Sequence, residues 1–204
     1  YFQGMAKHAI LVIDMLNDFV GEKAPLRCPG GETIIPDLQK IFEWVRGREG
    51  DDIHLVHIQE AHRKNDADFR VRPLHAVKGT WGSDFIPELY PQEDEYIVQK
   101  RRHSGFAHTD LDLYLKEEGI DTVVLTGVWT NVCVRSTATD ALANAYKVIT
   151  LSDGTASKTE EMHEYGLNDL SIFTKVMTVD QYIQAWENDE DPWVGGGDAQ
   201  NKVK

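Results

Sequence analysis

Asp14, Lys100 and Cys133 each stand at or shortly after the end of a short apolar run of the chain. Their types suit nucleophilic chemistry at a carbonyl. A thiolate attacks, a carboxylate takes the thiol proton and returns it to a leaving amine, and an ammonium stabilises negative charge. Taken singly, each has an ordinary alternative as a buried small hydrophobe, a turn cap or a solvated surface charge. Their common position on one sheet must decide between the two interpretations.

Cys133 lies where an expected strand gives way to an expected helix. The run 122–126 ends at Gly127, a turn comes next, and a helical pattern begins near residue 132. Unpaired N–H groups and the positive end of a helix dipole favour thiolate over thiol at such a position, and the same N–H groups can bind an oxyanion. An adjacent ammonium would lower the thiol pKa as well. We therefore expect a reactive cysteine if Lys100 lies beside it.

Strand and helix patterns alternate along the chain. Three runs are nearly continuous in apolar character, which is typical of strands buried on both faces: residues 8–13, 53–58 and 122–126. Further strands are expected at 95–99, 147–151 and 175–178, and helices at 34–48, 110–118 and 132–146. The alternation predicts an α/β fold of three αβα layers, with a doubly wound, mostly parallel, six-stranded Rossmann-like sheet in a single domain.

The residues directly after the expected strands lie at one edge of such a sheet, where ligands of open parallel sheets bind. They are Asp14, Gln59, Glu60, Lys100, Gly127 and Val128. Separate strand ends thus bring a carboxylate, an ammonium and, after a turn, a thiol to the same edge. This coincidence favours catalysis over three unrelated ordinary roles.

The length of 204 residues suits one ordinary domain and is short for two. Residues 1–4 read as the remnant of a cleaved expression tag, so we assign the domain to residues 5–186. Residues 187–204 are acidic and then glycine-rich without periodicity. We expect them to form a flexible tail unless they dock on a neighbour.

The composition excludes several classes of partner. The chain has 21 Lys and Arg against 34 Asp and Glu, and its net charge of -13 repels nucleic-acid backbones and anionic membranes. Its two cysteines form no CxxC or disulfide-rich spacing, which suits a reducing cytosol. No stretch approaches the roughly 20 apolar residues that span a bilayer. We predict a cytoplasmic protein with a small-molecule substrate and no nucleic-acid or membrane partner.

Three motifs carry a family resemblance. They are VIDMLNDF at 12–19, KRRHSGF at 100–106, and TGVWTNVCV at 126–134 followed by ATDA. In this order, across essentially the whole domain, they resemble the isochorismatase-like cysteine hydrolases. The resemblance implies that Asp14 is a general base, that Lys100 completes the triad and that Cys133 is the nucleophile. In amidase members the cysteine forms an acyl-enzyme that water cleaves. Members are commonly oligomeric, so a homodimer or homotetramer is expected.

The resemblance also assigns roles to the turn before the cysteine. The family carries a cis peptide bond there, which corresponds to the bond between Val128 and Trp129. By the same mapping, the backbone N–H groups of Trp129 and Cys133 form the oxyanion hole.

Four further side chains are candidates for substrate binding. Arg101 and His103 follow the triad lysine, and they offer donors for a substrate carboxylate or a urea oxygen. Phe19 and Trp129 offer apolar walls for a pocket. The ordinary alternatives are surface charges for the first two and plain core aromatics for the others.

A metal site is a further candidate. Family members that hydrolyse nicotinamide hold a metal through an Asp-x-His step after the second strand and a later histidine. Glu60, His62 and His75 stand in these places, with Asp66 at a further polar position, and such donors suit zinc or a similar divalent cation. Here Glu60 replaces the aspartate, and Ala61 replaces a usual aromatic residue. The alternative is histidines in solvent or loop hydrogen bonds. The thiol chemistry itself requires no cofactor.

We therefore predict a hydrolase that cleaves the C–N bond of a small amide or ureide through a cysteine thioester. The segment 100–106 resembles members acting on ureido and other linear amides more than it resembles nicotinamidases. Alternatives are a vinyl-ether hydrolase, a class in which some members dispense with the cysteine, a metal-binding nicotinamidase, and a non-catalytic protein of the same fold. A flavodoxin-like nucleotide binder is disfavoured, because no phosphate-binding glycine fingerprint follows the first strand.

Overall fold

The computed structural model describes residues 6–195, and six strands within this range form one sheet. All neighbouring strands pair in parallel, in the order β3-β2-β1-β4-β5-β6. The strands are β1 (His8–Ile13), β2 (Ile53–Glu60), β3 (Tyr96–Lys100), β4 (Thr122–Val128), β5 (Lys147–Ala156) and β6 (Lys175–Met177). The chain winds outward from β1 in both directions, which confirms the predicted doubly wound fold.

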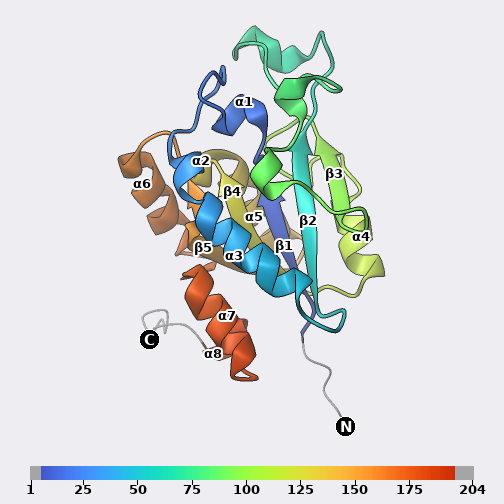
Figure 1. Ribbon diagram of the computed structural model, residues 1–204, viewed down its shortest axis with the longest axis vertical. Helices are drawn as coiled ribbons and strands as arrows, with labels where there is room; N and C mark the ends of the chain where they lie inside the picture. Colours follow the sequence, from blue (N-terminus) through green and yellow to red (C-terminus); the bar gives the residue numbers. More distant parts are fainter. Residues whose placement is uncertain (1–5, 196–204) are drawn as a thin grey trace.

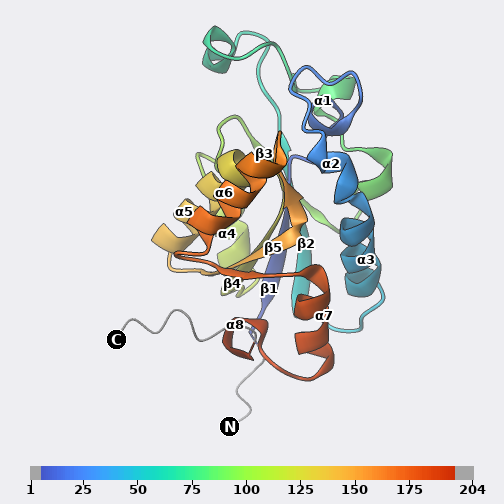
Figure 2. The same cartoon turned by 90° about the vertical axis from the view of Figure 1, so that its left-hand side faces the viewer.

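Helices cover both faces of the sheet (Figure 1, Figure 2). One face carries α1 (Asn17–Val20), α2 (Gly30–Thr33), α3 (Ile35–Arg46) and α7 (Val179–Glu187). The other carries α4 (Leu111–Glu117), α5 (Arg135–Ala143) and α6 (Glu160–Leu170). The shorter helical segments are η1 (Ala67–Arg70), η2 (Trp81–Ser83), η3 (Pro87–Leu89), the π-helical η4 (Thr130–Val134) and α8 (Pro192–Gly195).

Strand β1 separates two hydrophobic cores. Ile10 and Val12 belong to the core under α3 and α7, whereas Ala9, Leu11 and Ile13 belong to the core under α4, α5 and α6. Successive side chains of a strand point to opposite faces, so a strand buried on both faces needs an uninterrupted apolar run. This requirement explains why the pattern of residues 8–13 predicts the strand to its last residue.

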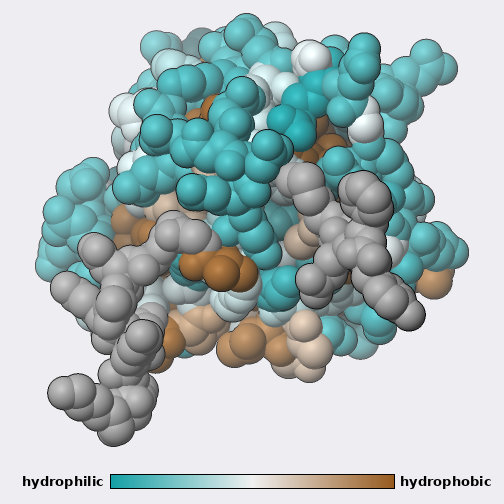
Figure 3. All heavy atoms as spheres, turned by 90° about the horizontal axis from the view of Figure 1, so that it is seen from below, coloured by the Kyte–Doolittle hydropathy of each residue, from teal (hydrophilic) through white to brown (hydrophobic). Residues whose placement is uncertain are grey.

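The surface at the end of the sheet where β1 begins is largely hydrophilic. Figure 3 shows this face from below, with hydrophilic residues over much of it and smaller apolar areas between them. Large apolar side chains are exposed elsewhere on the molecule as well, such as Leu113 on α4 and Leu142 on α5. Exposed apolar residues of this kind are normal on a folded protein, so they indicate no particular function.

Helices α6 and α7 are not among the elements that the pattern predicts. Along α6 only Gly166 and Leu170 are buried, so its apolar stripe is too thin to recognise. Helix α7 does carry a local signal, since Thr178 and Gln181 form a capping box at its start. That signal was available in the sequence and marks the beginning of the helix.

Element ends also differ from the prediction near the sheet edge. The expected helix 132–146 is divided into η4 and α5, because the turn after β4 has the wider π-helical hydrogen-bonding pattern that a 3.6-residue period does not reveal. Strands β2 and β4 run on to Glu60 and Val128. Polar and small residues at this edge remain paired, as Glu60 does with Lys100.

The last described residues follow α7 directly. The segment predicted as a tail starts at residue 187, which is the final residue of α7. Beyond it Trp193 lies in α8, is partly buried against the core, and accepts a hydrogen bond from Lys175 Nζ on its carbonyl oxygen at 2.6 Å. Residues 1–5 and 196–204, including the predicted tag remnant, lie outside the described residues. No helix within 6–195 is long and apolar enough to cross a membrane.

Gly127 lies on β4 directly opposite Ile13 of β1. Its φ is 96°, and a Cβ atom there would collide with the backbone of Ile13. We expect Gly127→Ala to lower the free energy of unfolding by at least about 3 kcal/mol, because both the conformation and the space exclude a side chain. Urea unfolding followed by circular dichroism measures the loss. In the control Gly105→Ala, the new Cβ meets its nearest neighbour at an ordinary 3.4 Å. Equal stability of the two variants would contradict the steric argument.

Candidate active site

Asp14, Lys100 and Cys133 come together at the carboxyl edge of the sheet. Asp14 follows β1, Lys100 ends β3, and Cys133 lies in η4 after β4. The Nζ atom of Lys100 is 2.8 Å from Oδ2 of Asp14 and 3.7 Å from Sγ of Cys133. The three residues are only 1%, 1% and 5% exposed. The separate elements thus bring a carboxylate, an ammonium and a thiol into one buried cluster.

The backbone turns sharply at Asp14. Its φ is 54°, in the left-handed region that aspartate tolerates better than most residues. The backbone N–H of Glu60 donates to Oδ1 of Asp14 at 3.0 Å. The end of β2 therefore holds one carboxylate oxygen, and the other faces Lys100.

Cys133 is held in the turn after β4. The peptide bond Val128–Trp129 is cis. The backbone N–H groups of Val132 and Val134 both donate to the carbonyl oxygen of Trp129, at 3.0 and 3.2 Å. These bonds close the turn around the thiol.

Burial and the neighbouring charges of opposite sign act in opposite directions on the pKa of each triad residue. It raises the pKa of the Cys133 thiol well above its ordinary value, although the Lys100 ammonium lowers it. Burial also raises the pKa of Asp14 against the same opposing charge. Burial by itself would lower the pKa of Lys100, but the negative charges around it outweigh burial and raise it. These shifts favour the neutral thiol over the thiolate, so a thiol in this place would need a neighbouring base before it could attack.

A cavity of about 160 Å³ lies beside the thiol. Its lining residues are Phe19, Leu26, Arg72, His103, Val128, Trp129, Val132 and Cys133. Three of the four predicted substrate-binding residues, Phe19, His103 and Trp129, are among them. Three larger hollows formed by described residues elsewhere on the surface are lined by none of the triad residues. The cavity is therefore the space in which a substrate can meet Cys133.

Arg101, the fourth predicted residue, is not in the cavity wall. Its side chain is 48% exposed, and its Nη1 atom lies 3.4 Å from Oδ2 of Asp66. A contact between Arg101 and a substrate stays a prediction. Arg72 takes a place in the wall that the sequence pattern does not indicate, because the loop that carries it has no periodicity.

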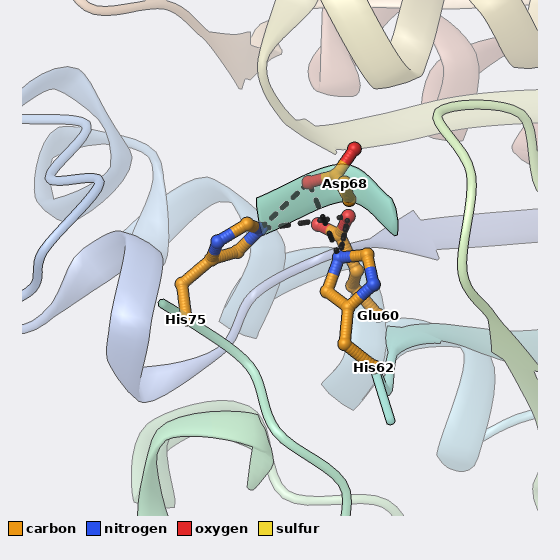
Figure 4. A group of neighbouring side chains, drawn as sticks. All are labelled: Glu60, His62, Asp68 and His75. Carbon is orange, nitrogen blue, oxygen red and sulfur yellow. Dashed lines mark hydrogen bonds and ion pairs between the residues drawn. The ribbon is translucent and has the colours of Figure 1, made fainter. Parts of the chain in front are cut away.

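A second cluster lies next to the triad, where Glu60, His62, Asp68 and His75 point toward one another (Figure 4). One donor atom from each lies within 4.8 Å of the others. Nε2 of His62 is 2.8 Å from Oε1 of Glu60 and 3.8 Å from Oδ2 of Asp68. Nε2 of His75 is 3.7 and 3.9 Å from the same two oxygens. The three residues predicted from the motif therefore converge, and Asp68 is a fourth donor that the motif does not indicate.

The residue types of this set suit a divalent cation, and Oε1 of Glu60 and Oδ2 of Asp68, which accept hydrogen bonds from Arg72, would be shared between the cation and the guanidinium. Nδ1 of His75 donates to the carbonyl oxygen of Pro73 at 2.6 Å, which leaves the lone pair on Nε2, a buried atom without a hydrogen-bond partner among residues 6–195. Two imidazoles and two carboxylates are a ligand set that zinc accepts. Asp66, expected at a ligand position, instead lies 3.3 Å from Nδ1 of His62. Asp66 therefore lies beside the ring nitrogen that faces away from the cluster and helps to orient the ring, because Nε2 of His62 faces Glu60.

Comparison with known proteins identifies a family and several solved structures to which this chain is similar. The isochorismatase domain model matches residues 8–181. An isochorismatase-like hydrolase from Alkaliphilus metalliredigens, known as a crystal structure, is 95% identical with a TM-score of 0.89 and covers 97% of this chain and 100% of its own. N-carbamoylsarcosine amidase from Thermoplasma acidophilum is 33% identical with a TM-score of 0.75, over 85% and 97% of the two chains. Pyrazinamidase of Pyrococcus horikoshii in complex with zinc is 32% identical with a TM-score of 0.75, over 84% and 99%.

Proposed function

The chain belongs to the isochorismatase family of hydrolases, and we propose that it cleaves a C–N bond of a small amide or ureide with Cys133 as the nucleophile. The observation that carries the proposal is the buried cluster in which Lys100 lies 2.8 Å from Asp14 and 3.7 Å from Cys133. A thiol attacks a carbonyl carbon, which a vinyl ether lacks, so the presence of Cys133 favours amide chemistry. The similarity to an N-carbamoylsarcosine amidase supports the same class.

Asp14 acts as the general base in this proposal. It takes the thiol proton as Sγ of Cys133 forms a bond to the substrate carbonyl carbon, and the carbonyl oxygen becomes an oxyanion. The oxyanion then collapses, the C–N bond breaks, and Asp14 returns the proton to the leaving nitrogen. Water next gives a proton to Asp14 and attacks the thioester carbon. The second oxyanion collapses, the C–S bond breaks, Asp14 gives its proton to Sγ of Cys133, and the acid leaves the regenerated thiol.

Lys100 stabilises the negative charge that moves through these steps. Its ammonium faces Asp14 and Cys133, and it is also 4.0 Å from Oε2 of Glu60. Because the group is buried, its charge acts at low dielectric and with little screening. We assign the oxyanion hole to the backbone N–H groups of Trp129 and Cys133, which belong to the turn that carries the thiol.

The second cluster makes a nicotinamidase-type amide the second candidate substrate. Glu60, His62, Asp68 and His75 would hold a divalent cation such as zinc. A bound cation would supply a positive charge that orients a polar group of the substrate. The similar pyrazinamidase was solved in complex with zinc, which supports this assignment.

Metal analysis tests the second cluster directly. After dialysis against Zn²⁺ and removal of the free ion, we expect wild type to retain about one ion per chain, with a higher melting temperature, because binding to the folded state stabilises it. His75→Ala removes one of four donors and is expected to lose most of the bound ion. His108→Ala removes an exposed histidine as the control. Equal zinc contents in His75→Ala and wild type would contradict the assignment.

Ammonia release from a panel of small amides tests the proposed function and separates the two substrate classes. The panel comprises nicotinamide, biuret, ureidoacrylate and N-carbamoyl amino acids, each measured with and without chelator. Preference for a ureide supports the linear-amide class, whereas preference for nicotinamide with sensitivity to chelator supports the metal-dependent class. Turnover of neither class by the folded protein would count against a C–N hydrolase and favour a vinyl ether or a binding role.

We further propose that the enzyme acts in the cytoplasm as a homodimer or homotetramer, and that residues 5–186 form its single domain. Both cysteines, Cys28 and Cys133, are free thiols, which suits a reducing compartment. Light scattering coupled to size-exclusion chromatography measures the oligomeric state.

A further inference from the structure

Arg72 brings a positive charge into the wall of the cavity beside Cys133. Its side chain is 22% exposed, and it is tied to the second cluster by two short contacts. Nε donates to Oδ2 of Asp68 at 2.7 Å, and Nη2 donates to Oε1 of Glu60 at 3.0 Å. The carboxylates of Asp68 and Glu60 therefore hold the guanidinium in one place.

The guanidinium keeps donors available for a further partner. It carries five N–H donors in a rigid planar fork. Within residues 6–195, the hydrogen bonds that it forms use Nε and Nη2, and none uses Nη1. A planar fork fixed by two bonds on one side is well ordered to bind a carboxylate with its remaining donors, since little side-chain freedom is left to lose.

The other residues of the cavity wall offer an anion few hydrogen-bond donors and little positive charge. Phe19, Leu26, Val128, Trp129 and Val132 contribute mainly apolar surface. An exposed histidine at position 103 is the other basic side chain of the wall. An anionic group that enters this cavity therefore meets its main hydrogen-bond donors on Arg72, although Glu60 and Asp68 balance part of the guanidinium charge.

We propose that Arg72 determines specificity by binding an anionic group of the substrate, a carboxylate close to the scissile carbonyl, and that Glu60 and Asp68 position its guanidinium. The substrate class is then a small amide or ureide that carries a carboxylate. The inference rests on the proposed function for the identity of Cys133 as the nucleophile.

Alkylation of Cys133 tests the inference without knowledge of the substrate. Iodoacetate and iodoacetamide are similar in size, and only the first is an anion. The ratio of their rate constants reports anion binding in the cavity and cancels changes in the intrinsic reactivity of the thiol. We expect the ratio for wild type to exceed that for 2-mercaptoethanol, and Arg72→Gln to lower it about tenfold, the size of a hydrogen bond to a charged group. Chelator is present throughout, so that no metal ion contributes.

Matched variants separate the role of Arg72 from general effects. Arg70→Gln makes the same change at an exposed site two residues away and should leave the ratio at the wild-type value. Arg72→Lys keeps the charge without the fork, and Asp68→Asn loosens the guanidinium, so each should give an intermediate ratio. Thermal melting verifies that each variant is folded.

An unchanged ratio in any folded variant that lacks the Arg72 charge overturns the inference, and the proposed function would still stand. If Cys133 reacts with neither reagent, the proposed nucleophile fails, and the inference fails with it. The two failures are therefore distinguishable.

Discussion

Cys133→Ala is expected to lower kcat/KM for the best amide of the panel by at least about 1,000-fold, because the variant has no atom that can form the acyl-enzyme. The loss should appear in kcat, since the cavity and its other wall residues remain. Ammonia release measures the rate. Mass spectrometry of the quenched wild-type reaction should detect the acyl group on the peptide that contains Cys133, and the variant should lack it.

Cys28→Ala is the matched control for this experiment. Cys28 is fully buried in the core under α3 and α7, and burial raises the pKa of its thiol to about 12. Unlike Cys133, it does not line the cavity, so its removal should change stability more than rate. Activity of Cys133→Ala that equals that of Cys28→Ala would show that Cys133 is not the nucleophile.

Lys100→Met is expected to abolish turnover and also to lower the free energy of unfolding by about 3 to 5 kcal/mol near neutral pH, because two buried carboxylates lose their cation. The ammonium lies 2.8 Å from Asp14 and 4.0 Å from Glu60, and its side chain has no exposed surface. Urea unfolding measures the stability. Lys116→Met is the control, since Lys116 is 62% exposed and pairs with Asp112 one turn away, a pair of small net value.

The loss in Lys100→Met should depend on pH in a defined direction. A carboxyl whose folded-state pKa is raised stabilises the fold below its unfolded pKa, about 3.9 for aspartate, and this contribution is lost as the pH rises through the folded pKa. Asp14 is such a group because burial raises its pKa, and Lys100 opposes that rise. Without Lys100 the pKa rises further. The stability difference from wild type should therefore be smaller at pH 5 than at pH 8, and a difference independent of pH would contradict this account.

The strand ends of the triad residues could be predicted from local pattern. A strand buried on both faces is apolar at nearly every position, so residues 8–13 and 122–126 could be predicted as strands, and Asp14 after the first run marks the edge of the sheet. The position of Asp14 follows from this rule, whereas Lys100 ends the edge strand β3, which is only partly buried and carries Gln99. Helix α6 could not be predicted from local pattern, because a helix that buries little apolar surface shows only a weak apolar periodicity.

The second cluster shows where prediction from sequence ends. Glu60, His62 and His75 could be proposed from their spacing, whereas Asp68 could not be distinguished from Asp66. The two carboxylates are two residues apart in an irregular loop, and only the path of that loop decides which one faces the histidines.

The sequence by itself therefore determined the parallel sheet and the edge at which the candidate site lies, because these depend on apolar runs and on the residues directly after them, whereas the triad is what the family resemblance implies. Only the tertiary structure showed that burial raises the pKa of the Cys133 thiol and that Arg72 lies in the cavity wall. Both depend on burial and on contacts between distant segments. A pKa is set by the solvent and charges that surround a group, and no local pattern of residues records those surroundings.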